Sequence, residues 1–371
     1  MSFHHMKMNK SIYIGAMSGT SHDAIDVSFI SVDKNITLEF FYSYKLPKSL
    51  RLKIANQISS NNSSLSNLGK LNKELGLAFF KAIDIGLTKS KITKSKIKCI
   101  AISGQTVRHE IQGKTSFSMQ LGDPNIVAAR TSIPVAYDFR NMHIALGGQG
   151  APLVPEFHEK IFFKKNKPRI ILNIGGIANY TYLGKKSQPW GSDTGPGNAL
   201  MDAYCSLKLG TNFDKNGARA SKGKVINKEL KKLLSNKFFK LPFPKSTGKE
   251  LFNSNLMTKS LMSNTHEDIL ATLSEFTARS ISDAITKNNH SNAQIIICGG
   301  GGNNTNLINR IRAHHDDLMD SEDLGFKSQA IESMAFAWLG FKRLNRQVSL
   351  IQVSRKKYSK GVLGSIARSK Q

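Results

Sequence analysis

The alternation of apolar and polar positions at the start of the chain predicts a β-hairpin followed by a third strand. Residues 12–17 form a short apolar run, and residues 25–30 alternate apolar and polar side chains as a half-buried strand does. Small and hydroxyl-bearing residues lie between these two runs, and residues 37–44 continue the strand pattern. We therefore expect a hairpin with a Gly/Ser/Thr loop at its tip.

The remainder of the first half alternates helical and strand patterns, which is typical of an α/β domain. One predicted strand ends in the polar set Gly104-Gln105-Thr106, and open α/β sheets place ligand groups at such strand ends. In chain order the pattern predicts a helical region at 47–85 with a polar interruption at 59–66, strands at 96–103, 116–121 and 133–139, and a helix at 125–130.

The second half repeats the arrangement of the first. An apolar run at 169–174 leads into Gly175-Gly176, and a further strand at 180–183 follows, so a second strand–glycine–strand hairpin is expected. The other predicted elements are helices at 153–164, from Asn198, at 268–285, from about 305 and at 329–339, a basic helical segment at 222–240, and a strand at 294–298.

Glycine-rich turns at the ends of buried strands in two duplicated halves suit a nucleoside triphosphate held from both sides. This is the plan of the actin, sugar-kinase and heat-shock ATPase superfamily. We therefore predict two duplicated actin-like (ribonuclease H-like) α/β domains flanking an ATP cleft. The expected divisions are an N-terminal domain at 1–150, a C-terminal domain at 151–345 and a basic tail at 346–371, to which no structure is assigned.

Composition supports a two-domain protein of the cytoplasm. At 371 residues the chain is long for one core. It lacks an apolar run of about 18 residues, which predicts no membrane span, and its first residues do not read as a secretory signal. Cys99, Cys205 and Cys298 are far apart and in no metal spacing, so we expect buried thiols in a reducing compartment.

A formal net charge of +27 raises the question of a nucleic-acid partner. The basic residues are spread over separate stretches such as 89–98, 222–240 and 355–360, with few aromatic residues between them. We interpret the charge as a solvated surface that also attracts an anionic small substrate, and nucleic-acid binding is the alternative.

Asp193 is the candidate catalytic carboxylate. It stands in Ser-Asp-Thr-Gly-Pro-Gly-Asn (192–198), where glycines and proline predict a tight, open loop before a helix with Asn198 near its N-cap. An acid just before a helix N-terminus is placed as a base beside an anion site. The alternative is an Asx-turn followed by a capped helix.

Two further glycine-containing loops are candidate nucleotide contacts. The tip of the first hairpin offers backbone N–H groups and hydroxyls to phosphates, and Asp23 and Asp26 are candidates to hold Mg²⁺ directly or through water. The four glycines at 299–302 let a planar or anionic ligand lie against backbone, although their spacing matches neither a dinucleotide fingerprint nor a Walker A loop. The alternative for the hairpin tip is a polar turn.

Taken together, these motifs resemble the anhydro-N-acetylmuramic acid kinase family over nearly the whole chain. Many matches occur in the right order, although each alone is weak. The matching stretches are residues 14–21, 104–106, 138–140, 147–155, 172–179, 193–198, 246–252, 271–273, 299–304 and 332–339.

The resemblance implies a cytoplasmic, dimeric kinase that uses ATP and Mg²⁺ in the recycling of bacterial wall sugars. Such enzymes phosphorylate the 6-oxygen of 1,6-anhydro-N-acetylmuramic acid while water opens the anhydro bridge at C1, giving N-acetylmuramic acid 6-phosphate. Asp193 would be the base that activates this water. Glu332 is a weaker candidate for sugar contact, since a lone acid in a helix's first turn also simply favours the helix dipole. The residues implied for ATP are Gly19, Thr20, Ser21, His22, Asp23, Ala24, Ile25 and Asp26 at the phosphates, Gly175 and Gly176 as the second phosphate loop, and Gly300, Gly301 and Asn303 near the adenosine.

Two positions depart from the family pattern. The family usually has glycine where Ala24 stands, so alanine is tolerated there only if its φ is negative. It tends to have an acid where His143 stands, which puts the local charge and a hydrogen bond in doubt. The alternative functions are another N-acetyl-sugar kinase with a free hydroxyl acceptor and a catalytically inactive nucleotide-gated binding protein.

Overall fold

Two sheets with the same strand plan organise the protein. The structure is a computed structural model that describes residues 10–19, 21–60, 64–111, 113–184, 188–248, 251–354 and 356–369. The chain divides into a first unit, Met1–Phe157 with Ala330–Gln371, and a second unit, His158–Gln329. This division differs from the expected one, because residues 330–371 join the first unit and do not form the end of a C-terminal domain and a separate tail.

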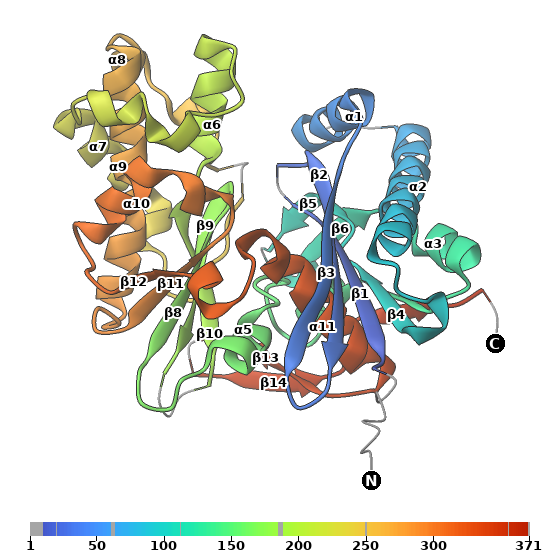
Figure 1. Cartoon of the computed structure of the whole chain (residues 1–371). Helices are drawn as coiled ribbons and strands as arrows, with labels where there is room; N and C mark the ends of the chain where they lie inside the picture. The colour runs from blue at the N-terminus through green and yellow to red at the C-terminus, as the bar shows by residue number, and fades with distance from the viewer. Residues whose placement is uncertain are drawn as a thin grey trace. The chain divides into compact units, whose positions relative to one another are not determined.

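The first unit is built on a six-stranded sheet in the order β15-β7-β4-β1-β2-β3 (Figure 1). Strands β1, β2 and β3 form an antiparallel meander, while β4 lies parallel to β1 and β7 parallel to β4. The strands of this sheet are β1 (Ile12–Ser18), β2 (Ala24–Val32), β3 (Ile36–Lys45), β4 (Ile97–Ile102), β7 (Val135–Tyr137) and β15 (Ser365–Ala367).

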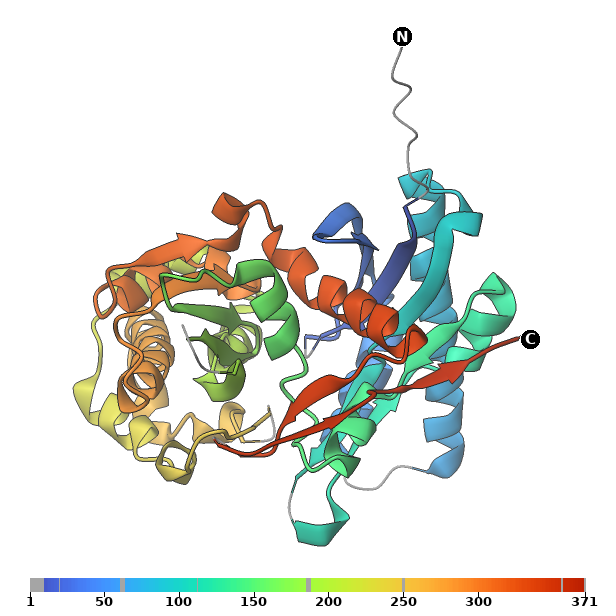
Figure 2. The same ribbon diagram turned by 90° about the horizontal axis from the view of Figure 1, so that it is seen from below.

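Helices cover both faces of this sheet because side chains alternate along β1. Ile12, Ile14 and Ala16 face the core that α2 (Leu65–Ser90) completes. Tyr13 and Gly15 face α11 (Ile331–Leu344), which runs alongside β1 (Figure 2). The other elements of this unit are α1 (Lys48–Ser59), α3 (Pro124–Thr131), α4 (Phe139–Ala145), and the hairpins β5 (Gln105–Glu110) with β6 (Phe117–Leu121) and β13 (Ser349–Gln352) with β14 (Tyr358–Gly361).

The second unit repeats the plan in a five-stranded sheet with the order β10-β9-β8-β11-β12. Again the first three strands are an antiparallel meander, and the next two lie parallel to the first. The strands are β8 (Arg169–Ile174), β9 (Ile177–Leu183), β10 (Trp190–Pro196), β11 (Gln294–Cys298) and β12 (Leu318–Asp320). This repeated topology confirms the predicted duplicated, actin-like α/β fold.

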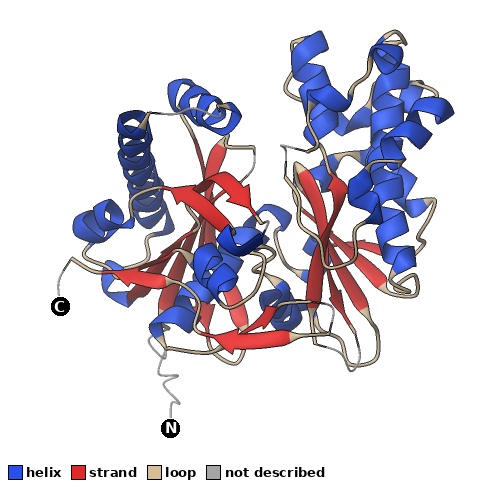
Figure 3. Cartoon of the chain, turned by 180° about the vertical axis from the view of Figure 1, so that it is seen from behind, coloured by secondary structure: helices blue, strands red, loops and turns tan. Residues whose placement is uncertain are grey.

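The apolar face of the second sheet is covered mainly by α9 (His266–Lys287), the long helix beside it (Figure 3). Fourteen of its residues are buried, as its apolar periodicity predicts. The Arg169 guanidinium, at the start of β8, donates a hydrogen bond to the carbonyl of Phe162, the last residue of α5 (Pro155–Phe162). The remaining helices are α6 (Ala199–Tyr204), α7 (Asn227–Leu234), α8 (Lys259–Met262) and α10 (Thr305–Arg312).

Most predicted elements are present, with differences where polar residues or short segments weaken the pattern. The expected strand at 133–139 ends at Tyr137, because Asp138 has a φ of 55° and α4 begins at Phe139. The hairpin strand β5 was not predicted, since its sequence is mostly polar. The tail forms β13, β14 and β15, although no structure was assigned to it.

Two expectations from composition can be compared with the structure. Cys99, Cys205 and Cys298 are free and buried, as predicted. Along the described ranges, the helices are all too short or too polar to cross a bilayer.

Candidate active site

The tip of the β1–β2 hairpin is a tight turn closed by its own backbone. The amide of His22 donates to the carbonyl of Gly19 at 3.1 Å, and His22 has a φ of 44°. The Ser21 hydroxyl donates to the Asp23 carboxylate. Thr20 lies outside the described residues. The turn therefore presents a compact run of hydroxyl and backbone groups, the chemistry expected of a phosphate loop.

A second turn, at the end of β4, is hydrogen-bonded to this hairpin tip and to the end of β1. The Ser18 hydroxyl donates to Gln105 Oε1 at 2.6 Å, and the Ser18 amide donates to Ser103 Oγ at 3.1 Å. Gln105 Nε2 donates in turn to the carbonyl of Gly19 at 3.4 Å. The polar set that follows β4 thus positions the hairpin tip, which is a supporting role that sequence reasoning did not assign to it.

The remaining candidates of the first hairpin lie in β2. Ile25 is fully buried in the core and pairs with Ser18 of β1 and Tyr44 of β3, so it has a structural role in the sheet. Asp26 pairs with Met17 across the hairpin and is partly exposed, while Asp23 is exposed at the tip. These two carboxylates are the oxygen donors that the hairpin offers.

In the second unit, the glycine turn after β8 is bound to the start of α6. The carbonyl of Gly175 accepts from the Asn198 amide at 2.8 Å, and the carbonyl of Gly176 accepts from the amides of Gly197 and Ala199 at 2.9 and 3.1 Å. Two motifs that are about 20 residues apart in the sequence are therefore one structural feature. Asn198 is the N-cap residue of α6, as predicted, although its side chain makes no capping hydrogen bond.

The four-glycine segment lies beside this turn because β11 is parallel to β8. It forms a short 3₁₀ helix, Gly300–Asn303, before α10. A Cβ on Gly299 would lie 2.3 Å from Asn173 Oδ1, and one on Gly301 would lie 2.3 Å from Ile174 Cγ2. The carboxyl ends of β8 and β11 therefore bring both glycine loops to one edge of the sheet, where open α/β sheets bind ligands.

Glycines of these loops fall into two groups. Some are glycine because the protein itself fills the space, as Gly299 and Gly301 are. In contrast, a Cβ on Gly300 would meet no described atom within 4 Å, and one on Gly175 would meet only the Ile177 carbonyl at 3.5 Å. At Gly175 and Gly300 the described residues therefore leave the space of a side chain open.

Asp193 lies within β10 and not in an open loop, which corrects the prediction for residues 192–198. Strand β10 pairs with β9, and the register shifts between Asp193 and Gly195. This irregularity lets Gly195 lie against Ser280 of α9, where a Cβ would be only 3.0 Å from the Ser280 hydroxyl. Gly195, one of the glycines that predicted a turn, instead permits close packing inside a strand.

The carboxylate of Asp193 is held by the segment that follows Lys245. Its Oδ2 accepts from the Thr247 amide at 2.8 Å and from the Ser246 hydroxyl at 3.4 Å. The Asp193 amide donates to the Lys245 carbonyl at 2.9 Å. Asp193 is 8% exposed, so it is a buried, oriented carboxylate of the kind that general bases require.

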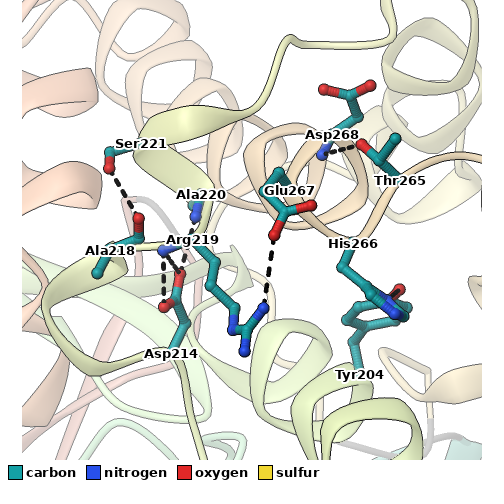
Figure 4. Close-up of polar contacts among 10 residues, drawn as sticks. All are labelled: Tyr204, Asp214, Ala218, Arg219, Ala220, Ser221, Thr265, His266, Glu267 and Asp268. Carbon is teal, nitrogen blue, oxygen red and sulfur yellow. Dashed lines mark hydrogen bonds and ion pairs between the residues drawn. The ribbon is translucent and has the colours of Figure 1, made fainter.

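A loop that sequence reasoning missed supports the four-glycine segment. The Asp214 carboxylate accepts from the amides of Arg219 and Ala220, and the Arg219 guanidinium pairs with Glu267 of α9 (Figure 4). Within this loop, a Cβ on Gly217 would lie 2.3 Å from Asn304 Oδ1, next to the 3₁₀ helix. The Asn216-Gly217 pair was the available signal, because such dipeptides mark turns.

The matching family model and two similar curated relatives agree on one family. A family model for anhydro-N-acetylmuramic acid kinases matches residues 11–369. An anhydro-N-acetylmuramic acid kinase of Gamma-proteobacterium EBAC31A08 is 57% identical over 98% of this chain and 100% of its own length. One from Shewanella halifaxensis is 43% identical over 91% of this chain and 93% of its own. The chain belongs to the anhydro-N-acetylmuramic acid kinase family.

Among solved structures, the activator of 2-hydroxyisocaproyl-CoA dehydratase from Clostridium difficile with bound ADPNP is similar at 12% identity. The match covers 90% of this chain and 96% of that one, with a TM-score of 0.45.

The two departures from the anhydro-N-acetylmuramic acid kinase pattern are accommodated. Ala24 begins β2, pairs with Lys45 and is not among the residues with positive φ, so it causes no backbone strain. His143 is buried, and its Nδ1 accepts from the Gly150 amide at 3.0 Å. Burial, with a smaller effect of the Arg140 charge, lowers the pKa of His143 to about 4. A neutral imidazole therefore supplies an acceptor there but not the negative charge of an acid.

Glu332 lies in the first turn of α11, in the first unit, whereas Asp193 lies in the second. A Cβ on Gly15 would lie 1.9 Å from the Ser333 carbonyl, so this turn of α11 touches the backbone of β1 directly. Its role in sugar contact remains a prediction.

Proposed function

We propose that this protein uses ATP to convert 1,6-anhydro-N-acetylmuramic acid and water into N-acetylmuramic acid 6-phosphate and ADP. Membership of the family named for this sugar supports the substrate. The observation that carries the proposal is the Asp193 carboxylate, which is buried and oriented by Thr247, in the strand that precedes the Asn198 amide bound to the glycine turn at Gly175.

The substrate's chemistry explains why one base suffices. The 6-oxygen is part of the anhydro bridge and carries no proton to remove. Asp193 takes a proton from water as that water attacks C1, the bond between C1 and the 6-oxygen breaks, and the released oxygen takes the γ-phosphoryl group of ATP. General-base assistance of this kind contributes about 10²–10⁴ in rate, and positioning supplies much of the rest.

Each unit contributes its own groups to ATP in this proposal. The first offers the hairpin residues from Gly19 to Asp26. The second offers the turn at Gly175-Gly176 for phosphate, and Gly300, Gly301 and Asn303 for the adenosine. Oriented backbone N–H groups suit phosphate oxygens because they add positive potential without a mobile side chain.

The first hairpin fits Mg²⁺ of the kind that accompanies a nucleotide. Its donors are Asp23 and Asp26, and no cluster of three or more His, Cys, Asp or Glu that could hold a metal occurs among the described residues. Mg²⁺ in kinases is held by one or two carboxylates together with substrate phosphates, so two carboxylates are sufficient. When bound, the ion would neutralise charge that develops on the phosphoryl oxygens.

The decisive experiment supplies the protein with ATP, Mg²⁺ and the anhydro sugar in water enriched in ¹⁸O. We expect ADP and a 6-phosphorylated sugar carrying one solvent oxygen at C1, detected by mass spectrometry before the anomeric oxygen exchanges. N-acetylglucosamine, which has a free 6-hydroxyl, is the control acceptor.

The alternatives predict different products in the same assay. Phosphorylation of the control sugar, without turnover of the anhydro sugar, would identify a kinase with an ordinary hydroxyl acceptor. ATP binding without any ADP from either sugar would identify a nucleotide-gated binding protein and contradict the proposal. Homodimerisation, a cytoplasmic location and a place in the recycling of wall sugars belong to the same proposal, and size-exclusion chromatography with light scattering tests the first of these.

A further inference from the structure

A buried lysine lies next to the candidate base. Lys245 is 6% exposed, and its ammonium group lies over the rings of Phe238 and Phe243, at 4.3 and 4.5 Å from their centroids. A third ring, that of Phe239, is 5.7 Å away. The ammonium donates to the Phe238 carbonyl at 2.9 Å. The resemblance to the anhydro-N-acetylmuramic acid kinase family implied no functional role for this side chain.

The backbone of Lys245 is joined to the strand that carries Asp193. The Lys245 amide donates to Ser192 Oγ at 2.9 Å, and the Lys245 carbonyl accepts from the Asp193 amide. The next two residues, Ser246 and Thr247, hold the Asp193 carboxylate. Anchoring the Lys245 side chain therefore fixes the short segment that orients the base.

Charge also links the two residues. Burial, with a smaller contribution from Lys287, lowers the pKa of Lys245 to about 8, and the negative charge of Asp193 opposes this shift. By reciprocity, the Lys245 cation favours the ionised form of Asp193, which is the form a base requires. No ion pair between described residues includes Lys245.

We propose that Lys245 is a positioning residue for Asp193: its ammonium, held among three phenylalanine rings, anchors residues 245–247 and keeps the carboxylate ionised and oriented. The expected effect of Lys245 on kcat rests on the proposed function. Its effect on the ionisation of Asp193 does not, because that ionisation can be measured in the protein without substrate. The other buried lysine of the described residues offers a comparison. Lys342 is also 6% exposed and lies over the Trp338 ring, but it pairs with Glu156 in the first unit.

The test measures kcat against pH for the wild-type protein and for Lys245→Met, Lys245→Arg and Lys342→Met. In Lys245→Met we expect the acidic limb, where the base becomes protonated, to move up by roughly half a unit to one unit, with kcat reduced about tenfold and KM for ATP within about twofold. Lys245→Arg keeps the charge and should retain the wild-type limb. Lys342→Met should lower stability and leave the limb in place.

A purely structural role would give a different result. If Lys245→Met is folded and its acidic limb and kcat match the wild-type values, Lys245 does not position the base. If the wild-type protein makes no 6-phosphate sugar, the proposed function fails, and the inference is decided by ¹³C titration of the Asp193 carboxyl carbon, assigned with Asp193→Asn.

The same ¹³C titration still tests the inference if Lys245→Met does not fold, because it needs only the wild-type protein and Lys245→Arg. In the wild-type protein the Asp193 carbon signal should show a second step near pH 8, where Lys245 loses its proton, and this step should be absent from Lys245→Arg. A wild-type signal without that step would overturn the inference.

Discussion

At the scale of single residues, the orientation of one carboxylate governs the chemistry. Asp193 Oδ2 accepts from Thr247 and Ser246, so the carboxylate is fixed before any substrate arrives. Such a preformed base is worth more than a mobile one because no reorganisation is needed during the reaction.

Asp193→Asn tests this role with little change of shape, since the amide oxygen can still accept from Thr247. We expect kcat to fall by about 10² or more, because an amide cannot take a proton from water, while the Kd for ATP changes by less than about threefold. Calorimetric ATP binding and ADP production measure the two effects. Loss of ATP binding would instead make Asp193 a phosphate-site residue.

The buried charge of Lys245 also predicts a dependence of stability on pH. Its pKa is about 8 in the folded protein, against 10.5 as its ordinary value, so the unfolded chain binds more protons between these two values. Stability from this group therefore rises with pH across that window. The unfolding free energy of the wild-type protein, relative to Lys245→Met, should increase by on the order of 1–3 kcal/mol from pH 7.5 to 10. Urea unfolding at both pH values measures this difference, and an unchanged difference would contradict it.

At the scale of elements, the contact between α11 and β1 depends on the absence of a side chain at Gly15. A Cβ there would lie 1.9 Å from the Ser333 carbonyl and 2.4 Å from the Ala337 amide nitrogen. Both contacts are to backbone, so no side chain can move to relieve them. The helix and strand must therefore separate if any other residue is introduced.

Gly15→Ala should thus reduce the free energy of unfolding by roughly 2–4 kcal/mol. Gly69→Ala is the matched control, since Gly69 is exposed in α2 with no described atom within 4 Å of its Cβ position. It should be neutral or stabilising by up to about 1 kcal/mol. Thermal unfolding of both variants, followed by circular dichroism, makes the comparison. Equal stability of the two variants would show that α11 can shift without cost.

The candidate nucleotide loops allow the opposite test at Gly300, where a larger side chain should change ATP binding and not stability. Because its Cβ position is open, Gly300→Val should leave the melting temperature within about 2 °C of the wild-type value. If adenosine lies against this segment, the Kd for ATP should increase about tenfold, with Gly300→Ala intermediate. Fluorescent nucleotide binding measures the series, and Gly69→Ala again serves as control. Unchanged ATP affinity in Gly300→Val would remove Gly300 from the site.

At the scale of the whole molecule, the end of the chain completes the first unit. Strand β15 pairs with β7, and Ile351, Leu363 and Ala367 are at least 92% buried. The basic composition of this region concealed its role, because its strands are short and its apolar residues are few. A tail that sequence reasoning left without structure is therefore part of a sheet.

Removal of residues 346–371 should consequently destabilise the protein by about 3–6 kcal/mol, from the lost burial of these side chains alone. Removal of residues 369–371 keeps β15 and is the control. Soluble yield and thermal unfolding distinguish the two truncations. A shorter protein as stable as the control would show that β15 is dispensable to the sheet.

The sequence by itself determined the repeated strand–glycine–strand order, the long amphipathic helices and the chemistry available at Asp193. These follow from local periodicity and from residue type, which do not depend on distant contacts. It did not determine that Asp193 lies within a strand, because glycine signals a turn, a bulge or a close contact equally well.

Tertiary structure decided the features that join distant segments. The Gly175 turn meets Asn198, Gln105 supports the hairpin tip at Gly19, and Thr247 orients Asp193. Each of these contacts has a backbone amide or carbonyl on at least one side, and every residue offers the same carbonyl and every residue but proline the same amide. Their partners are therefore set by the course of the chain in space, and the identity of the side chains alone does not reveal them.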